Sequence, residues 1–300
     1  MNYPRTETVL REWEQASAGD PKLTMMQHAH LMNIPYEIYR ARMDTARRAR
    51  EIKGKIEYSL GQPLKLSGDW MIVGDVHSPF TDYDFATLVS MVARKQLPKS
   101  ARRLLVAGDF FNMDVFSRYP HLVNAPTWAQ EREAAKGLID EWLNTFSEIV
   151  FLMGNHDRRL QKFVAGAFDE TDIFALVKAN PSLVKASNFG WCTIDTPGGI
   201  YRVTHPMNYS INQLGVADVL AQKYGQHVIS FHEHHLSAGY DRYKRYVVIN
   251  GGCLVDPGKL AYVSLDDSKS AGMAAGFVML RNGAPYVFGK APFTDWDRWI

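Results

Sequence analysis

Three short apolar runs, each ending in glycine and then Asp or Asn, constrain the fold of this chain more than any other feature. The runs cover residues 71–73, 104–107 and 149–153, and Asp75, Asp109 and Asn155 follow them. Between the runs, apolar residues keep helical spacing. Short apolar strands that alternate with helices are typical of a buried parallel sheet in an α/β fold. Functional side chains of such sheets lie just past the carboxyl ends of the strands, where all three polar clusters fall.

Hairpin signals replace the helical pattern after about residue 190. Residues 197–199 (Pro-Gly-Gly) and Asn282-Gly283 each separate two stretches that favour β-structure, and residues 246–249 predict a further strand. Short Gly-containing and Asn-Gly connections are typical of β-hairpins. The second half of the chain therefore predicts additional sheet that is partly antiparallel.

The first sixty residues predict short helices, with a break at Asn33-Ile34 and Pro35 in the first turn of the next helix. Two helices joined by a tight turn indicate a helix-turn-helix segment. We place the domain boundary before Ser67-Gly68, which gives a helical segment over residues 1–65 and a catalytic domain over 66–300. The last of these helices is basic and suits contacts with DNA phosphates, although a solvated helix face explains the charge equally well. Its candidate DNA-binding residues are Arg40, Arg42, Arg47 and Arg48.

The bulk composition is that of an ordinary globular protein. The chain has 300 residues, of which 46% are hydrophobic and 22% charged, and its net charge of +2 does not by itself indicate a nucleic-acid partner. Two cysteines do not make a disulfide framework, which favours a reducing compartment. The first residues lack the apolar core of a signal peptide, and no stretch approaches the about 18 apolar residues of a membrane span. We therefore expect a cytoplasmic protein that does not bind membranes.

Five polar clusters carry the chemistry, and their carboxylate, imidazole and amide groups can bind a metal ion or support its ligands. This mixed nitrogen and oxygen set suits manganese, iron, zinc or nickel. No cysteine joins it, which argues against a structural zinc site. The clusters are Gly74-Asp75-Val76-His77, Gly108-Asp109-Phe110-Phe111-Asn112, Gly154-Asn155-His156-Asp157, Val203-Thr204-His205 and His232-Glu233-His234.

The spacing within the clusters has a physical reason. In an extended chain residues i and i+2 point the same way, so Asp75 and His77 can reach one ion, as can His232 and His234. Asp109 has two carboxylate oxygens and can bridge two ions about 3.5–4 Å apart, the arrangement that phosphoryl chemistry uses. A glycine before each Asp or Asn permits a tight turn and keeps side chains away from the metals.

Each cluster taken alone has an ordinary explanation. A single Asp after a strand is usually a cap or turn residue, a lone histidine such as His205 is usually hydrogen-bonded in a core or on a surface, and Gly-Asn favours a turn. These explanations fail together, because unrelated turns would have to supply a complete ligand set in order. The sequence therefore predicts a metal site.

The ordered set DxH, GDxxN, GNHD, a lone histidine after a strand, and HxH resembles the signature of calcineurin-like metallophosphoesterases over roughly residues 70 to 256. The resemblance implies a β-sandwich of mixed sheets flanked by helices, here with a small all-α N-terminal domain, an order that resembles some phage-encoded members. Phe231 stands where the family usually has glycine before HxH, so we expect the local backbone geometry to differ from the family pattern. His235 would allow a register shifted by one, but His232 and His234 keep the i, i+2 relation.

The resemblance also implies a role for each matching position. Asp109 looks like the bridge between two divalent ions, of which manganese is the first choice and iron, zinc, nickel and magnesium are alternatives. The nucleophile would be a hydroxide that bridges the two ions. The positions that match the family's ligands of the first ion are Asp75, His77 and His234. Those that match the ligands of the second ion are Asn155, His205 and His232.

His156 matches the proton donor to the leaving oxygen, and Asp157 would orient it or tune its charge. Asn112 is given a supporting role near the substrate. Arg158 and Arg159 either clamp a phosphate or cap the next helix. The apolar residues after the second cluster offer either a surface on which bases stack or a lid that packs on the domain, and the lid is favoured. They are Phe110, Phe111, Met113, Phe116, Tyr119 and Trp128.

The motifs also bear on the substrate. Protein phosphatases of this family typically show GDxxDRG and GNHE, whereas this chain continues Asn112-Met113-Asp114 and ends the third motif in Asp157. That difference favours phosphodiesterases and nucleases, and the basic segment makes hydrolysis of DNA phosphodiesters our first choice. A phosphodiesterase or phosphatase of small nucleotides is the alternative. A DNA-binding regulator with an inactive phosphoesterase domain is the non-enzyme alternative, against which the intact ligand set speaks.

Overall fold

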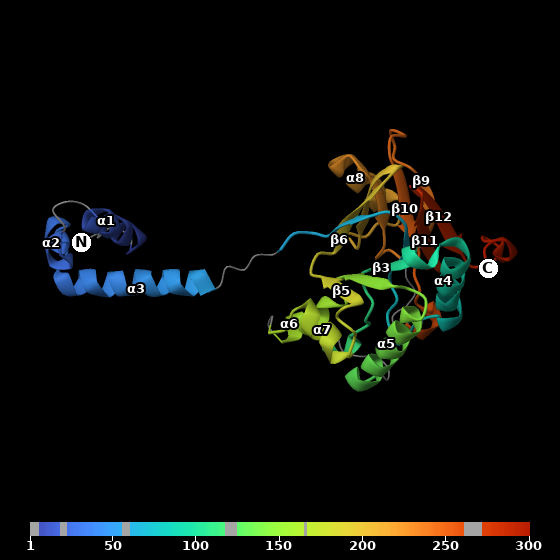
Figure 1. The fold of residues 1–300 in the computed structure, drawn as a ribbon, viewed down its shortest axis with the longest axis horizontal. Coiled ribbons are helices and arrows are strands. Elements are labelled where there is room, and N and C mark those ends of the chain that lie inside the picture. Colours follow the sequence, from blue (N-terminus) through green and yellow to red (C-terminus); the bar gives the residue numbers. More distant parts are fainter. Residues whose placement is uncertain (1–5, 19–22, 56–60, 118–124, 165–166, 261–271) are drawn as a thin grey trace. The chain divides into compact units, whose positions relative to one another are not determined.

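The computed structural model describes residues 6–18, 23–55, 61–117, 125–164, 167–260 and 272–300. The chain divides into two compact units, Met1–Gly61 and Gln62–Ile300, which Figure 1 shows with their elements labelled. Among the described residues, no helix is long and apolar enough to cross a bilayer.

The described part of the first unit is all helical, as the sequence predicts. It contains α1 (Thr6–Ala18), α2 (Met25–Leu31) and α3 (Tyr36–Lys55). Thr24 begins α2 with a capping box, in which its hydroxyl accepts from the Gln27 backbone and the Gln27 side chain accepts from the Thr24 backbone. The turn before α3 includes Asn33 in the left-handed region, at φ 53°.

The apolar residues of the first unit pack on one another. Leu10, Tyr39 and Met43 are buried in a core of their own, and Trp13 and Tyr36 lie against it. Three of the four candidate arginines on α3 are exposed and Arg42 is half-buried. Since the apolar face is used inside the unit, α3 presents a basic outer surface. The helix-turn-helix assignment and DNA binding by this segment stay predictions.

The second unit contains two mixed sheets of six strands each in its described residues. The first sheet has the order β12-β11-β2-β3-β4-β5 and the second the order β1-β6-β7-β8-β10-β9. The bounds of the strands are β1 Lys65–Ser67, β2 Trp70–Val73, β3 Arg103–Ala107, β4 Glu148–Leu152, β5 Val184–Ser187, β6 Trp191–Thr196, β7 Gly199–Thr204, β8 His227–Ser230, β9 Leu236–Tyr240, β10 Val247–Gly251, β11 Gly276–Arg281 and β12 Ala284–Gly289.

The three apolar runs are the parallel strands β2, β3 and β4. Ile72 pairs with Leu105, and Leu105 with Val150, in two adjacent parallel ladders. Both hairpins are also present, with β6 antiparallel to β7 and β11 antiparallel to β12. The predicted fold class, mixed sheets flanked by helices, is confirmed.

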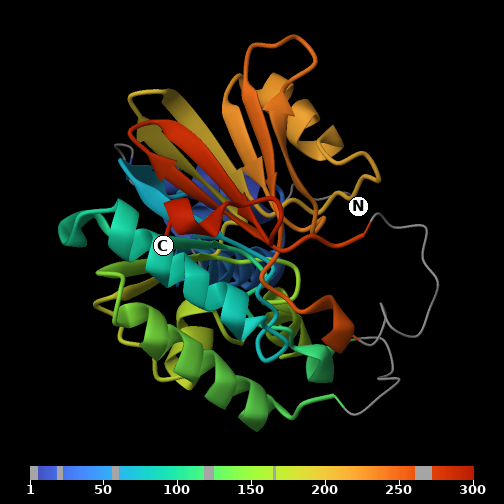
Figure 2. The ribbon, with the colours of Figure 1, turned by 90° about the vertical axis from the view of Figure 1, so that its right-hand side faces the viewer.

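Alternate side chains of the strands are buried in two different hydrophobic cores. Trp70 and Ile72 of β2 point between the sheets, whereas Met71 and Val73 point to the helices on the other face. Figure 2 shows α4 (teal) and α5 (green) on one side of the sandwich and α8 (orange) on the other. The helices of this unit are α4 Tyr83–Gln96, α5 Trp128–Leu143, α6 Arg158–Phe163, α7 Glu170–Leu176 and α8 Gly215–Tyr224.

The apolar residues after the second motif pack on the domain, as expected for a lid. Phe110, Phe111 and Met113 are buried in the helix-side core, and Phe116 and Trp128 lie against that core. These rings are thus engaged with one another rather than offered to a base. Tyr119 lies outside the described residues.

Candidate metal centre

All seven predicted metal ligands lie in loops that follow strands of the two sheets. Because β2, β3 and β4 are parallel in one sheet and β7 and β8 are parallel in the other, the loops at their carboxyl ends can meet at one edge of the sandwich. The residues and the strands that precede them are Asp75 and His77 (β2), Asp109 (β3), Asn155 (β4), His205 (β7), and His232 and His234 (β8).

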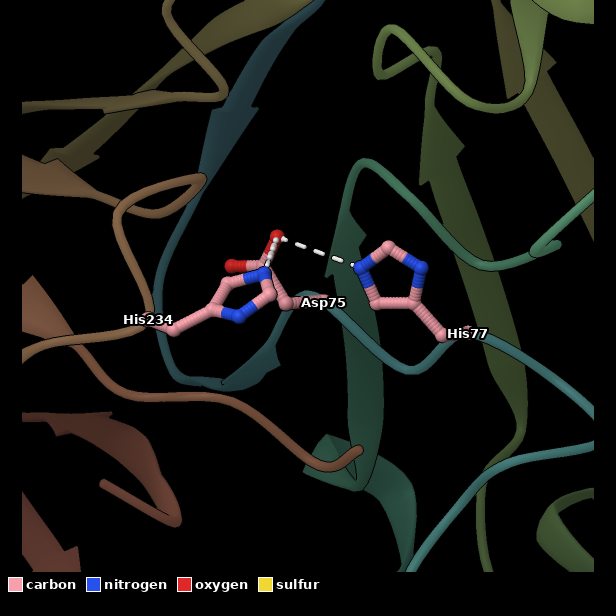
Figure 3. A group of neighbouring side chains, drawn as sticks. All are labelled: Asp75, His77 and His234. Carbon is pink, nitrogen blue, oxygen red and sulfur yellow. Dashed lines mark ion pairs between the residues drawn. The ribbon is translucent and has the colours of Figure 1, made fainter. Parts of the chain in front are cut away.

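Asp75, His77 and His234 form one group whose candidate ligand atoms all lie within 4.8 Å of one another. The Asp75 Oδ1 atom is 3.2 Å from His234 Nε2 and 3.9 Å from His77 Nε2. Figure 3 shows both rings turned toward the carboxylate from two different loops. This arrangement offers two nitrogens and one oxygen to a single cation.

Asp109, His205 and His232 form a second group of the same kind. His205 Nε2 lies 3.2 Å from Asp109 Oδ2 and 3.1 Å from Asn155 Oδ1, so Asn155 adjoins this group. Asp109 also forms a third group with His77 and His156, in which its Oδ2 lies 3.9 Å from His77 Nε2. Asp109 thus stands between the two groups.

The histidine rings are held with Nε2 directed into the cluster. His77 Nδ1 is 3.2 Å from Asn112 Oδ1, and His205 Nδ1 is 3.0 Å from the Ala107 carbonyl. An imidazole that donates from one nitrogen to an oxygen presents the other as a ligand. His77 Nε2 is buried and has no hydrogen-bond partner among the described residues. A buried, unpaired ring nitrogen facing carboxylates fits a divalent cation.

Charge within the cluster also suits a cation. Burial opposes ionisation of Asp109, yet the neighbouring histidines hold its pKa well below the usual range, and His234 lowers the pKa of Asp75 in the same way. Burial, together with His156, lowers the pKa of His77 well below its usual value. Against burial, Asp109 raises the pKa of His205 to about 9, so a metal ion there displaces a proton.

The backbone at these ligands is left-handed, not extended as the i, i+2 argument assumes. The φ angles are 51° at Asp75, 48° at His77, 52° at Asp109, 83° at His232 and 56° at His234. Non-glycine residues rarely adopt this region, at a cost of about 1 kcal/mol or more each, and such residues cluster at functional sites. The side chains therefore converge because each loop turns sharply after its strand.

Two glycines of the motifs are needed for close approach. A Cβ at Gly154 would collide with the backbone and carboxylate of Asp109. A Cβ at Gly74 would lie 2.5 Å from the ring of Phe231, which is fully buried. Phe231, the departure from the family pattern, therefore fills the space beside Gly74, and His232 and His234 still reach the cluster. His235 belongs to none of the metal-capable groups among the described residues.

His156 belongs to the third metal-capable group, with His77 and Asp109, and its backbone N–H donates to Asp109 Oδ1 at 2.8 Å. Its Nδ1 lies 2.8 Å from the Asn112 carbonyl, and its Nε2 lies 3.1 Å from Arg159 NH2. Burial lowers the pKa of His156. Arg159 also donates to the Asn112 carbonyl and to Asp114 Oδ1 at 2.5 Å. The Asn112 side chain is buried against His77, which fits a supporting role beside a candidate ligand, and its contact with a substrate stays a prediction.

Asp157 has different partners from those the resemblance implied. Its Oδ2 accepts from the Asp109 and Gly154 backbones at 2.8 and 2.9 Å, and its Oδ1 accepts from the Phe111 backbone at 2.9 Å. Burial and the Asp109 charge raise the pKa of Asp157 to about 7. Asp157 ties the second motif loop to the third, and the Asn112 carbonyl orients His156 instead.

The two arginines after the third motif are the first residues of α6. Arg158 donates to the Asn188 side chain at 2.9 Å and to the Asn188 carbonyl. Arg159 makes the contacts to His156 and Asp114 given above. Phosphate binding by either residue stays a prediction.

Two buried glutamates lie near the site, of which Glu233 is a member of the fifth cluster found in the sequence, whereas Glu131 was not identified from the sequence. Glu131 accepts from the Met113 backbone at 2.7 Å, and burial raises its pKa to about 8. Glu233 accepts from the Ser210 backbone at 2.7 Å and from Asn250 at 2.9 Å, and burial raises its pKa to about 7. Glu131 was detectable, since it continues the apolar face of α5 that includes Ala135, Leu138 and Trp142.

Comparison with known proteins gives the family. The sequence model described as Calcineurin-like phosphoesterase matches residues 70–263, which is more than half of the chain. The chain therefore belongs to the calcineurin-like phosphoesterase family, and its aspartate and histidine groups are candidate metal ligands.

The solved structures to which the chain is similar share little sequence with it. Vps29 of Chaetomium thermophilum is 11% identical with a TM-score of 0.38, over 74% of this chain and 96% of the other. The protein TT1561 of Thermus thermophilus is 9% identical with a TM-score of 0.37, over 74% and 98%. No curated protein sequence matches the chain.

Proposed function

We propose that the chain is a dinuclear metal-dependent phosphodiesterase that cleaves nucleic-acid phosphodiesters, with DNA as the first-choice substrate. The observation that carries the proposal is the pair of ligand groups that meet at Asp109. Two divalent ions held there would neutralise phosphate charge and make water a nucleophile near neutral pH. Asp75, His77 and His234 would hold one ion, and Asn155, His205 and His232 the other.

In this proposal His156 delivers a proton to the leaving oxygen. The Asn112 carbonyl accepts from Nδ1 and fixes the ring, so Nε2 is the atom that faces the reaction. In the structure an Arg159 N–H points at Nε2, and this contact favours the neutral ring. For Nε2 to carry a proton, Arg159 must direct its N–H elsewhere, and a substrate phosphate is a suitable acceptor. Such an exchange would couple substrate binding to protonation of His156.

The choice of a nucleic-acid substrate rests on charge outside the metal centre. Arg40, Arg47 and Arg48 are exposed on α3, on a unit that has buried its own apolar face. Exposed arginines on one helix suit phosphate contacts. The third motif, ending in Asp157, also differs from the protein-phosphatase pattern.

The test is an assay of the full chain with Mn²⁺, Mg²⁺, Zn²⁺ and Ni²⁺. The substrates are bis-p-nitrophenyl phosphate, p-nitrophenyl phosphate, and single- and double-stranded DNA. The proposal expects hydrolysis of the diester and of DNA, with the monoester poorer, and loss of both activities in Asp109→Asn. Preference for the monoester, or activity on diesters that survives Asp109→Asn, would refute it.

A further inference from the structure

Arg202 is a buried arginine that lies between two aromatic rings. Its guanidinium carbon is 3.5 Å from the centre of the Trp191 ring and 3.9 Å from that of Tyr224, and the residue is only 6% exposed. Tyr201 and Val203, its neighbours on β7, point into the core between the sheets. Side chains alternate along a strand, so Arg202 points to the opposite face, toward the end of α8.

The stacked rings contact the faces of the guanidinium and leave its edges open. A guanidinium carries five N–H donors in its plane, and stacking satisfies none of them. Within the described ranges, Arg202 has no hydrogen-bond acceptor and no ion-pair partner. Arg103 makes a useful contrast, because it stacks on Trp70 at 4.5 Å but donates to the Ser67 and Asp69 carbonyls at 2.8 and 3.0 Å. Because Arg202 lines the pockets described below, its free donors are available to water or to a ligand.

A pocket of about 370 Å³ borders Arg202 and the loops that follow β4 and β7. Its lining includes Gly154 and His205, whose imidazole is fully buried, together with Trp191, Arg202 and Tyr224. Arg202 also lines a second pocket of about 550 Å³, but the residues that line that pocket include none of the seven candidate ligands. The pocket of about 370 Å³ is therefore the one that adjoins loops carrying candidate ligands.

The charged side chains that line this pocket are all positive. Besides Arg202, its lining contains Arg158 and the exposed Lys223, and none of its described lining residues is acidic. Arg202 precedes His205 by three residues, and three residues of extended strand span about 10 Å. A group bound at Arg202 is thus separate from the phosphate that would be cleaved at the cluster.

We propose that this pocket binds a second phosphate of the substrate, with Arg202 donating in-plane hydrogen bonds to it and Lys223 adding charge at the rim. The inference rests on the phosphodiesterase function proposed above. It implies that the substrates of the enzyme contain at least two phosphates. A nucleic-acid strand and a nucleoside polyphosphate share this chemistry. The pocket therefore selects for chains of phosphates over isolated diesters.

The test compares a substrate that has one phosphate with one that has several. The kcat/KM of the full chain is measured for bis-p-nitrophenyl phosphate and for a 5′-phosphorylated thymidine tetranucleotide. Arg202→Met keeps the apolar contact with both rings but removes the donors. It is expected to lower the ratio of the tetranucleotide value to the diester value by roughly 10- to 100-fold, mainly through KM, because the variant cannot form hydrogen bonds to a charged group. Arg245→Met is the matched control.

Arg245 suits this purpose because it lies 5.0 and 5.5 Å from the Tyr243 and Tyr246 rings and is outside the pocket lining. Its substitution is expected to leave the ratio unchanged. If Arg202→Met does not fold, the exposed Lys223→Met is expected to lower the same ratio by a smaller factor. Equal losses on both substrates, or an unchanged ratio in the Arg202 and Lys223 variants, would overturn the proposal.

A binding assay separates this inference from the proposed function. Without added metal, the affinity of a fluorescein-labelled tetranucleotide is measured by anisotropy for the wild type and for Arg202→Met. A wild type that is inactive in the assay with added metal, but whose binding without metal weakens in the variant, would refute the phosphodiesterase function and keep the phosphate pocket. Competition by adenosine diphosphate or by unlabelled tetranucleotide then shows which source of phosphate binds more tightly. Undiminished binding in the variant would overturn the pocket.

Discussion

Glu131→Gln is expected to change how the stability of the protein depends on pH. Glu131 is 1% exposed and accepts from the Met113 backbone, which has the left-handed φ of 52°. A glutamine keeps the shape and the acceptor oxygen but cannot ionise. The variant therefore removes one titrating group while the hydrogen bond to Met113 is retained.

The sign and size of the effect follow from the pKa of Glu131, which burial raises from 4.5 to about 8. Between these values the folded state holds a proton that the unfolded state has released. The stability contributed by Glu131 is therefore largest below about pH 4.5 and falls as the pH rises toward 8. One group contributes a slope of at most about 1.4 kcal/mol per pH unit, or about 2 kcal/mol between pH 6 and 7.5.

Urea unfolding at several pH values measures this slope. The free energy of unfolding of Glu131→Gln minus that of the wild type should increase from pH 6 to 7.5, because only the wild type loses stability at this position. Glu133→Gln, at an exposed residue of the same helix, should show a constant difference. A difference for Glu131→Gln that is flat, or that decreases with pH, would refute the reasoning.

Three other substitutions or truncations test separate parts of the account. Asp157→Ala leaves three buried N–H groups without an acceptor and should lower the free energy of unfolding by about 3 kcal/mol or more, measured by urea titration; a loss below about 1 kcal/mol would contradict the tie between the two loops. His156→Ala should lower kcat by about 10²–10⁴-fold on DNA but less on a p-nitrophenyl diester, with metal content unchanged by mass spectrometry; equal losses would argue against proton donation. Removing residues 1–61 should leave hydrolysis of the small diester unchanged and weaken the salt dependence of DNA affinity. The slope of log K against log salt concentration should decrease by about 0.9 for each phosphate that this unit neutralises, and an unchanged slope would exclude DNA binding by this unit.

Much of the fold was predictable because its strands are buried on both faces. β2 is apolar at all four positions, so periodicity and the following Gly-Asp identify it without tertiary information. Asn282-Gly283 similarly identifies the turn of the last hairpin. The pairing of β1 with β6 was not predictable, because Lys65–Ser67 is short and partly exposed and only its partner strand defines it.

The site was predictable as a set of residues but not as a geometry. Residue types and order were enough to name candidate ligands that the structure brings together, such as Asp75 and His234. The left-handed backbone at these positions left no signal, because Asp and His adopt that region only where the surrounding loops require it. The partners of Asp157 depend on two loops that are distant in sequence, and Arg202 acquires its setting only when β7, β6 and α8 meet.

The most direct test of the central claim is the number of metal ions bound per chain. Purified protein is equilibrated with Mn²⁺, freed of excess ion and analysed by inductively coupled plasma mass spectrometry, together with Asp109→Asn and the exposed Asp140→Asn as control. Because Asp109 stands between the two ligand groups, the account predicts two ions in the wild type and the control, and at most one in Asp109→Asn. One ion in the wild type, or two in Asp109→Asn, would contradict the assignment.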